Sequence, residues 1–106
     1  MLPVTWVEVC SVDDVFEGRI NGFDAAGRRV LVLRFDDQFV ALEGTCTHEE
    51  ADLSSGFLLA GRITCPLHLS QFDAKTGQVY NPPAERGLPK YHVKTHGGRV
   101  LVDLPA

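Results

Sequence analysis

Two short cysteine–histidine pairs lie in the middle of the chain. Cys46 and His48 form a CxH pair, Cys65 and His68 form a CxxH pair, and sixteen residues separate the two pairs. Thiolate sulfur and imidazole nitrogen are ligands that iron, zinc and copper accept in proteins. We therefore expect a metal site to which two loops each contribute one cysteine and one histidine.

This ligand set suits a binuclear iron–sulfur core. A [2Fe-2S] core takes two protein ligands on each iron, and in a Rieske centre two histidines replace the two cysteines of one iron. The charges of two ferric ions, two sulfides and two thiolates cancel, whereas four thiolates would leave the oxidised core negative. Reduction is easier for that reason, and Rieske potentials lie at about −150 to +300 mV against about −400 mV for plant-type ferredoxins. The two pairs predict one Rieske-type [2Fe-2S] cluster used in one-electron transfer.

A structural zinc site is the main alternative for these side chains, because zinc also binds two cysteines and two histidines in a tetrahedron. Zinc fingers usually place the two cysteines together and then the two histidines together, and the order here alternates. A chance grouping of unligated side chains is less expected still.

The composition is that of one ordinary folded domain. A chain of 106 residues, 44% hydrophobic and 23% charged, is typical of a soluble globular protein. The formal net charge is −4 and no Lys/Arg run exceeds Arg28-Arg29, which argues against nucleic-acid binding. The acidic first twenty residues indicate neither a signal peptide nor a membrane anchor, so we expect a cytoplasmic protein. Disulfides are uncommon there, and metal ligation is the better use for some of the three cysteines.

The elements that position the ligand pairs are expected to be strands. Apolar residues between the turns alternate with a period of two, which predicts an all-β fold. Residues 30–35 are apolar on both faces apart from Arg34, as expected of a central strand, and form a predicted hairpin with 39–42. Residues 19–23 precede them across a turn at 24–27, so a three-stranded meander results.

A second hairpin is predicted near the C-terminus, where residues 91–96 and 99–103 flank Gly97-Gly98. One short helical turn is expected between Val12 and Glu17.

The domain organisation follows from these elements. We expect a single domain over 1–106, with base strands at about 1–43 and 84–106 and a cluster-binding subdomain at about 44–83.

The central stretch also carries a family resemblance. The segments CTH and CPLH, followed by Phe72-Asp73 and Thr76-Gly77, are similar to the Rieske-type ferredoxins of bacterial multicomponent aromatic-ring-hydroxylating dioxygenase systems. Asn81-Pro82-Pro83 resembles the proline-containing third loop of that family. The resemblance covers nearly the whole chain, and its N-terminal part matches in general pattern only.

The resemblance implies a fold and a ligand arrangement. The fold would be an antiparallel β sandwich base that carries a small cluster-binding subdomain of loops and short strands. Cys46 and Cys65 would bind the buried iron, and His48 and His68 would bind the outer iron. The exposed imidazole edges would then be the electron exit.

The resemblance also implies a function. The chain would be a soluble one-electron carrier, and no enzyme by itself, between a flavin-dependent NAD(P)H-oxidising ferredoxin reductase and a terminal oxygenase. It would act as a monomer with neither nucleic acid nor membrane as a partner. The alternatives are a Rieske-like small subunit of a larger reductase such as nitrite reductase and a zinc-stabilised interaction module. The four ligands disfavour the first, because some such subunits lack them.

Two further comparisons bear on the reduction potential. High-potential relatives join their ligand loops by a disulfide, and the corresponding positions here are Ala51 and Leu67. Those relatives also place Ser and Tyr hydroxyls near the cluster, and here the positions hold Ser70 and Phe72. We expect a potential in the lower part of the Rieske range, because one donor that stabilises the reduced state is absent.

Other residues receive simpler interpretations. Glu49, Glu50 and Asp52 follow the first ligand pair and are expected either to face a positively charged partner or to be solvated. Cys10 is expected to be a small packed side chain instead of a reactive thiol, and Trp6 is expected in the core.

Overall fold

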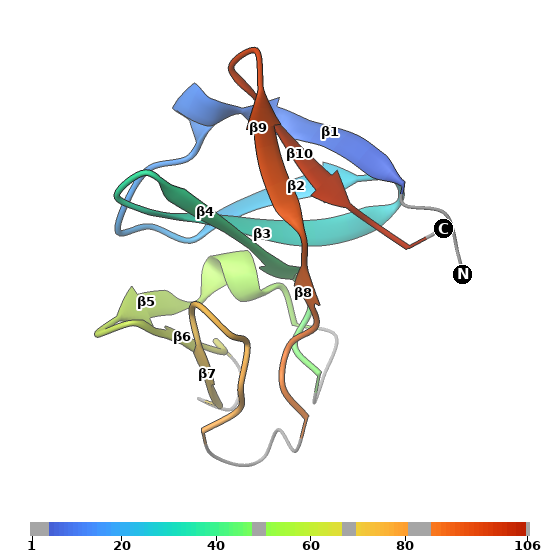
Figure 1. Ribbon diagram of the computed structural model, residues 1–106. Coiled ribbons are helices and arrows are strands. Elements are labelled where there is room, and N and C mark those ends of the chain that lie inside the picture. Colours follow the sequence, from blue (N-terminus) through green and yellow to red (C-terminus); the bar gives the residue numbers. More distant parts are fainter. Residues whose placement is uncertain (1–4, 48–50, 67–69, 81–85, 106) are drawn as a thin grey trace.

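The computed structural model describes residues 5–47, 51–66, 70–80 and 86–105 (Figure 1). Within these ranges the strands form three antiparallel sheets. The first has the order β1-β10-β9, the second β2-β3-β4-β8, and the third β5-β6-β7. The predicted all-β fold is therefore confirmed.

The strand bounds in chain order are β1 (Trp6–Ser11), β2 (Asn21–Ala25), β3 (Arg28–Phe35), β4 (Gln38–Glu43), β5 (Phe57–Leu59), β6 (Arg62–Thr64), β7 (Gln71–Asp73), β8 (Lys90–Tyr91), β9 (Val93–His96) and β10 (Arg99–Asp103). Two single 3-10 turns lie at Val12–Asp14 (η1) and Leu53–Ser55 (η2).

Strand β3 lies between two hydrophobic cores. Val30 and Val32 pack towards the first sheet, in one cluster with residues of β10. Leu31 and Leu33 pack towards the third sheet, in a second cluster that contains Ile63. Figure 1 shows the same order, with β5–β7 on the opposite side of β3 from β9 and β10. The run of apolar residues on both faces correctly predicted this central strand.

The N-terminal meander is confirmed with shifted bounds. Each of its turns has two residues between the paired strands, because Ala25 pairs with Arg28 and Phe35 pairs with Gln38. Tight turns of this kind require left-handed backbone, and Ala26 has a φ of 51°. The first predicted strand begins and ends two residues later than expected, so that its turn is shorter.

The C-terminal hairpin is confirmed around its two glycines, since His96 pairs with Arg99. The expectation of one strand over 91–96 is wrong. Tyr91 in β8 pairs with Ala41 of the second sheet, whereas β9 pairs with β10 of the first. The chain changes sheets at His92, as strands do where they turn the corner between two packed sheets.

The expectation that Trp6 is in the core is also wrong. Its side chain is 38% exposed, and the Lys94 ammonium lies 4.1 Å from the ring centroid. The cation lies over the ring face, where the quadrupole of the indole attracts it. Cys10 is buried as expected. The helical turn of 12–17 is shorter than expected and ends at Asp14.

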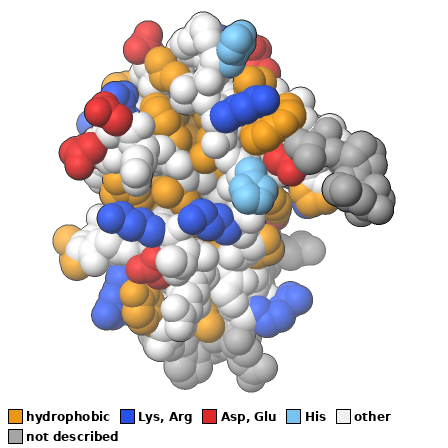
Figure 2. All heavy atoms as spheres, in the orientation of Figure 1, with side chains coloured by type: hydrophobic (Ala, Val, Ile, Leu, Met, Phe, Trp, Pro, Cys, Tyr) orange, Lys and Arg blue, Asp and Glu red, His pale blue; other side chains and the backbone are white. Residues whose placement is uncertain are grey.

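The surface carries both signs of charge. Figure 2 shows basic and acidic side chains interspersed on one face of the molecule. None of the helices in the described part of the chain is long and apolar enough to cross a membrane.

Candidate metal centre

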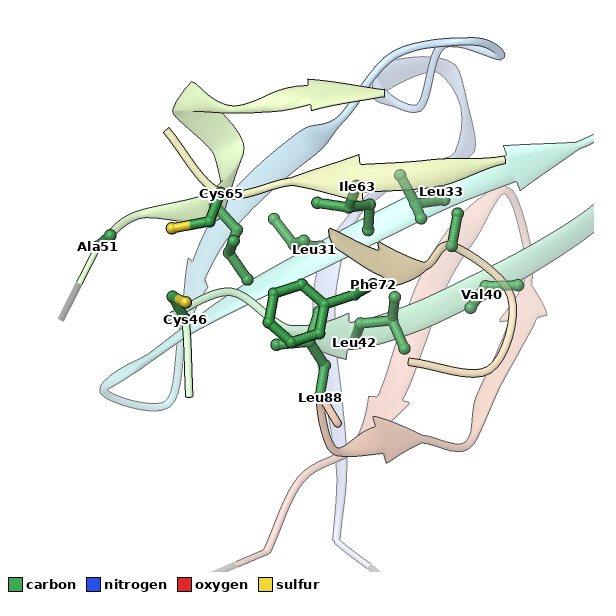
Figure 3. Packing of buried hydrophobic residues seen from close by; sticks show 12 residues of the cluster. Leu31, Leu33, Val40, Leu42, Cys46, Ala51, Ile63, Cys65, Phe72 and Leu88 are labelled. Atoms are coloured by element: carbon green, nitrogen blue, oxygen red, sulfur yellow. The ribbon is translucent and has the colours of Figure 1, made fainter. Parts of the chain in front are cut away.

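Two of the four predicted ligands are described, and they lie in one place. Cys46 and Cys65 are 5% and 1% exposed and belong to the same hydrophobic cluster. Figure 3 shows both side chains at one end of this cluster, near Ala51. Neither cysteine is in a disulfide. His48 and His68 lie outside the described residues.

The two cysteine loops close in the same way. The Cys46 amide donates to the Ala51 carbonyl at 2.9 Å, and the Cys65 amide donates to the Ser70 carbonyl at 2.8 Å. In both loops the bond spans five residues and the predicted histidine lies inside it. The described ends of both segments are therefore joined by the same main-chain hydrogen bond, although the CxH and CxxH spacings differ. The sequence predicts the ligand pairs, but nothing in it indicates that this hydrogen bond is the same in both.

The second loop is part of a continuous ladder. Cys65 directly follows β6 and Ser70 directly precedes β7, and these strands are paired from Thr64–Gln71 to Arg62–Asp73. The loop is thus the tip of a hairpin. Ser70 is itself fully buried.

The first loop is supported differently. After the end of β4 at Glu43, Thr45 forms an isolated bridge with Asp52. The Leu53 amide donates to the Gly44 carbonyl at 2.9 Å, and the Gly44 amide donates to the Arg29 carbonyl at 2.9 Å. No β-ladder of the described strands continues into this loop. Its base rests on the backbone of β3.

The surroundings of the cysteines are apolar. Leu31, Phe72 and Leu88 pack in the same cluster, and Phe72 is the largest fully buried side chain among the described residues (Figure 3). Such packing excludes water and lowers the local dielectric, both of which influence a metal's potential. Phe72 places a ring without a hydroxyl in this core.

The first loop also contacts the segment after the predicted proline loop. The Thr47 hydroxyl donates to the Arg86 carbonyl at 2.7 Å. Thr47 and Arg86 line a shallow pocket beside Cys46, together with Glu43 and Pro89. The proline residues themselves, Pro82 and Pro83, lie outside the described residues.

Asp52 does not serve as a free surface charge. Its carboxylate accepts from the Ser54 amide at 2.9 Å and from the Ser54 hydroxyl at 2.7 Å, and both its oxygens lie 3.3–3.4 Å from Arg29 Nε. Burial raises the pKa of the Asp52 carboxyl, but hydrogen bonds from Ser54 and Arg29 outweigh it and hold the pKa below the ordinary value. Glu49 and Glu50 are outside the described residues.

The donor chemistry fits an iron–sulfur cluster. Thiolates are the usual ligands of such clusters, and here two cysteine side chains, free of disulfides, come from separate loops to one buried place. The loops that hold them are the ones predicted to carry the two imidazoles.

Comparison with known proteins gives consistent results. The Rieske [2Fe-2S] domain family matches residues 5–92. The ferredoxin component of the naphthalene 1,2-dioxygenase system of Pseudomonas putida is 32% identical over 103 residues, covering 97% of this chain and 99% of the relative. The ferredoxin component of the alkene monooxygenase system of Xanthobacter autotrophicus is 36% identical over 100 residues, covering 93% and 81%.

A solved ferredoxin–oxygenase complex also contains a chain with this fold. The complex of reduced oxygenase and oxidized ferredoxin in carbazole 1,9a-dioxygenase contains a chain that superposes with a TM-score of 0.83 at 35% identity. The match covers 95% of this chain and 94% of that one.

Proposed function

The chain belongs to the Rieske [2Fe-2S] domain family, and on that premise we propose that it is a one-electron carrier in a multicomponent oxygenase system. It would take electrons from a flavin-dependent NAD(P)H-oxidising reductase and deliver them to the terminal oxygenase of an aromatic-ring dioxygenase. The full-length match to ferredoxin components supports the carrier role, and the carbazole complex supports an oxygenase as the partner. The alkene monooxygenase relative widens the class of oxygenase that the test must include.

The observation that carries the proposal is the pair of equivalent loops. Each places a buried cysteine at the same end of one core. We propose that Cys46 and Cys65 bind one iron and that His48 and His68 bind the other. A bound Rieske cluster stores one electron at a potential above that of all-cysteine clusters. The residues of the chain exclude water around the two sulfur atoms and fix the loops that carry them.

The arrangement of the sheets supports a division of the chain into a base and a cluster-binding part. We propose that 1–43 and 84–106 form the base and that 44–83 forms the cluster-binding subdomain. The third sheet lies within the latter segment and shares its core with β3 and β4. A monomeric state in the cytoplasm completes the proposal for a free carrier.

Spectroscopy of the purified protein tests the cofactor. We expect visible absorption before reduction and a rhombic paramagnetic resonance signal after dithionite, with two irons and two sulfides per chain. The variants C46A and C65A should lose this signal, and C10A should keep it because Cys10 lies in the other hydrophobic cluster. A colourless wild-type protein that contains zinc would overturn the proposal in favour of an interaction module.

Reconstitution tests the carrier role. NADH oxidation by a flavin-dependent ferredoxin reductase, coupled to a naphthalene, carbazole or alkene oxygenase, should depend on this chain. The alternative, a small subunit of a larger reductase, predicts stable co-elution with that reductase and no free carrier activity. A redox titration with a midpoint well above 0 mV would contradict the expected low potential.

A further inference from the structure

We propose that Arg29 is a positioning residue for the metal centre: its guanidinium holds the first ligand loop against β3 and so controls iron retention and reduction potential. The inference rests on the proposed function, because it concerns the loop that carries Cys46 and the predicted ligand His48.

Arg29 holds three acidic or hydroxyl partners at once. Its Nη2 donates to the Ser54 hydroxyl at 2.9 Å, and its Nε lies 3.3 Å from an Asp52 oxygen. Its Nη1 lies 3.3 Å from Asp24, the residue opposite on β2. The guanidinium has five N–H donors in a rigid planar fork, so it can bridge several acceptors in one fixed geometry.

These contacts of Arg29 with Ser54, Asp52 and Asp24, which we call the clamp, are connected to Cys46 through short backbone steps. Asp52 pairs with Thr45, and its neighbour Ala51 accepts the amide of Cys46. Arg29 also supports the loop with its own carbonyl, which accepts from Gly44. A displacement of Asp52 therefore shifts both sides of the loop on which Cys46 sits.

Two glycines make room for the arginine. A Cβ at Gly22 would lie 2.8 Å from Arg29 Nη2 and 2.5 Å from Ser54 Cβ, and a Cβ at Gly44 would lie 2.7 Å from Arg29 Cγ. All three distances are too short for a real Cβ contact, so a side chain at either position would push Arg29 and its partners apart. Neither glycine has a positive φ. Close approach to the arginine and its partners is therefore the physical reason for glycine here.

The second loop shows why the first requires such a clamp. The Cys65 loop is the tip of the β6–β7 hairpin, whose ladder runs up to it. The Cys46 loop has one isolated bridge at its base. With Ala51 at the position where high-potential relatives carry a cysteine, a disulfide does not cross-link it. The three-way contact of Arg29 supplies the constraint that a ladder supplies to the other loop.

The experiment compares R29M with R99M in cluster-loaded protein. Arg99 pairs with Glu8 at 3.1 Å, between β10 and β1, so R99M removes the same charge and a similar ion pair away from the loops. The first measurement is iron release to a ferrous chelator. We expect R29M to release iron about tenfold faster than wild type, which is near the contribution of one charge-assisted hydrogen bond. We expect R99M to be unchanged.

Two further measurements separate positioning from general loss of stability. Hydrogen exchange of peptides covering 44–53 should speed up in R29M, while exchange over 63–72 should not. The reduction potential should fall in R29M and move far less in R99M, because a positive charge close to the centre favours the reduced state. R29K should retain most of the potential, because it keeps the charge, and should still lose iron quickly, because it lacks the fork.

The variant S54A tests the same contacts if R29M fails to fold. It removes one bond to Arg29 and one to Asp52 without a change of charge. We expect iron release about two- to fivefold faster than wild type, with an unchanged spectrum. Equal rates of iron release from R29M, S54A and R99M would overturn the proposed role of Arg29 and leave the proposed function standing. A wild-type protein without iron and sulfide would overturn the proposed function.

Discussion

Replacing Gly77 with alanine should destabilise the fold through one close backbone contact. Gly77 has a φ of +80°, and a Cβ there would overlap the carbonyl oxygen of Leu88. The Leu88 amide donates to the Gly77 carbonyl at 2.7 Å, and the Leu88 side chain is buried in the core that holds both cysteines. Alanine therefore forces two segments apart where the chain returns to the base.

The magnitude follows from the separate contributions. An L-residue in left-handed backbone costs about 1–2 kcal/mol. Displacement of the Leu88 hydrogen bond costs about 1 kcal/mol more, and partial withdrawal of Leu88 from the core adds to this. We expect G77A to lower the free energy of unfolding by roughly 3 kcal/mol. At about 4–8 °C per kcal/mol for a domain of this size, the apparent melting temperature should fall by roughly 12–24 °C.

Gly61 provides the matched control. Its φ is +75°, and a Cβ there would have no neighbour within 4 Å. G61A should therefore show the backbone cost alone, roughly half of the loss in G77A. The assay is thermal unfolding of both variants by circular dichroism and by bleaching of the visible absorption, at one scan rate and equal iron content. Equal losses in G77A and G61A would show that residues 77 and 88 are not in contact, and would refute the reasoning.

Three further predictions concern buried polar groups. The Asn21 side-chain amide donates to three main-chain carbonyls, at 3.1 Å each. The variant N21A should therefore lower the free energy of unfolding in urea by roughly 2–4 kcal/mol. A decrease below about 1 kcal/mol would contradict these bonds. Burial and a hydrogen bond to Glu43 raise the pKa of Tyr91 to about 12. Because the fold favours the neutral phenol, this stabilisation is complete below pH 10 and is lost as the pH rises towards 12. Circular dichroism between pH 9 and 12 should show that dependence in wild type and much less of it in Y91F. Burial, with a smaller contribution from Asp14, raises the pKa of the Cys10 thiol to about 11. Cys10 should therefore react with a disulfide reagent at pH 8 only after unfolding, and fast reaction in the native protein would disprove its burial.

Local patterns predicted much of the framework. The apolar alternation of 30–35 and the glycine pair at 97–98 each specified an element, since strand periodicity and turn chemistry are properties of a few adjacent residues. The two cysteine–histidine pairs were readable for the same reason. Their spacing of two and three residues needs no knowledge of the fold.

Long-range contacts could not be predicted from the sequence. Arg29 and Asp52 are 23 residues apart, and Thr47 and Arg86 are 39 apart, so no periodicity links them. Trp6 was misplaced because hydrophobicity alone does not say that Lys94 will cover its ring at the surface. The change of sheet at His92 was missed because 91–96 reads locally as one strand.

Residue types and their spacing were enough to identify the side chains suited to bind metal and to predict the strands around them. That Cys46 and Cys65 meet in one dry core, each with a main-chain hydrogen bond to the residue five positions on, follows only from the fold. The fold also places one loop at the tip of a hairpin and the other against an arginine. The physical reason is that ligand identity is a property of single residues, whereas ligand position depends on how distant segments pack.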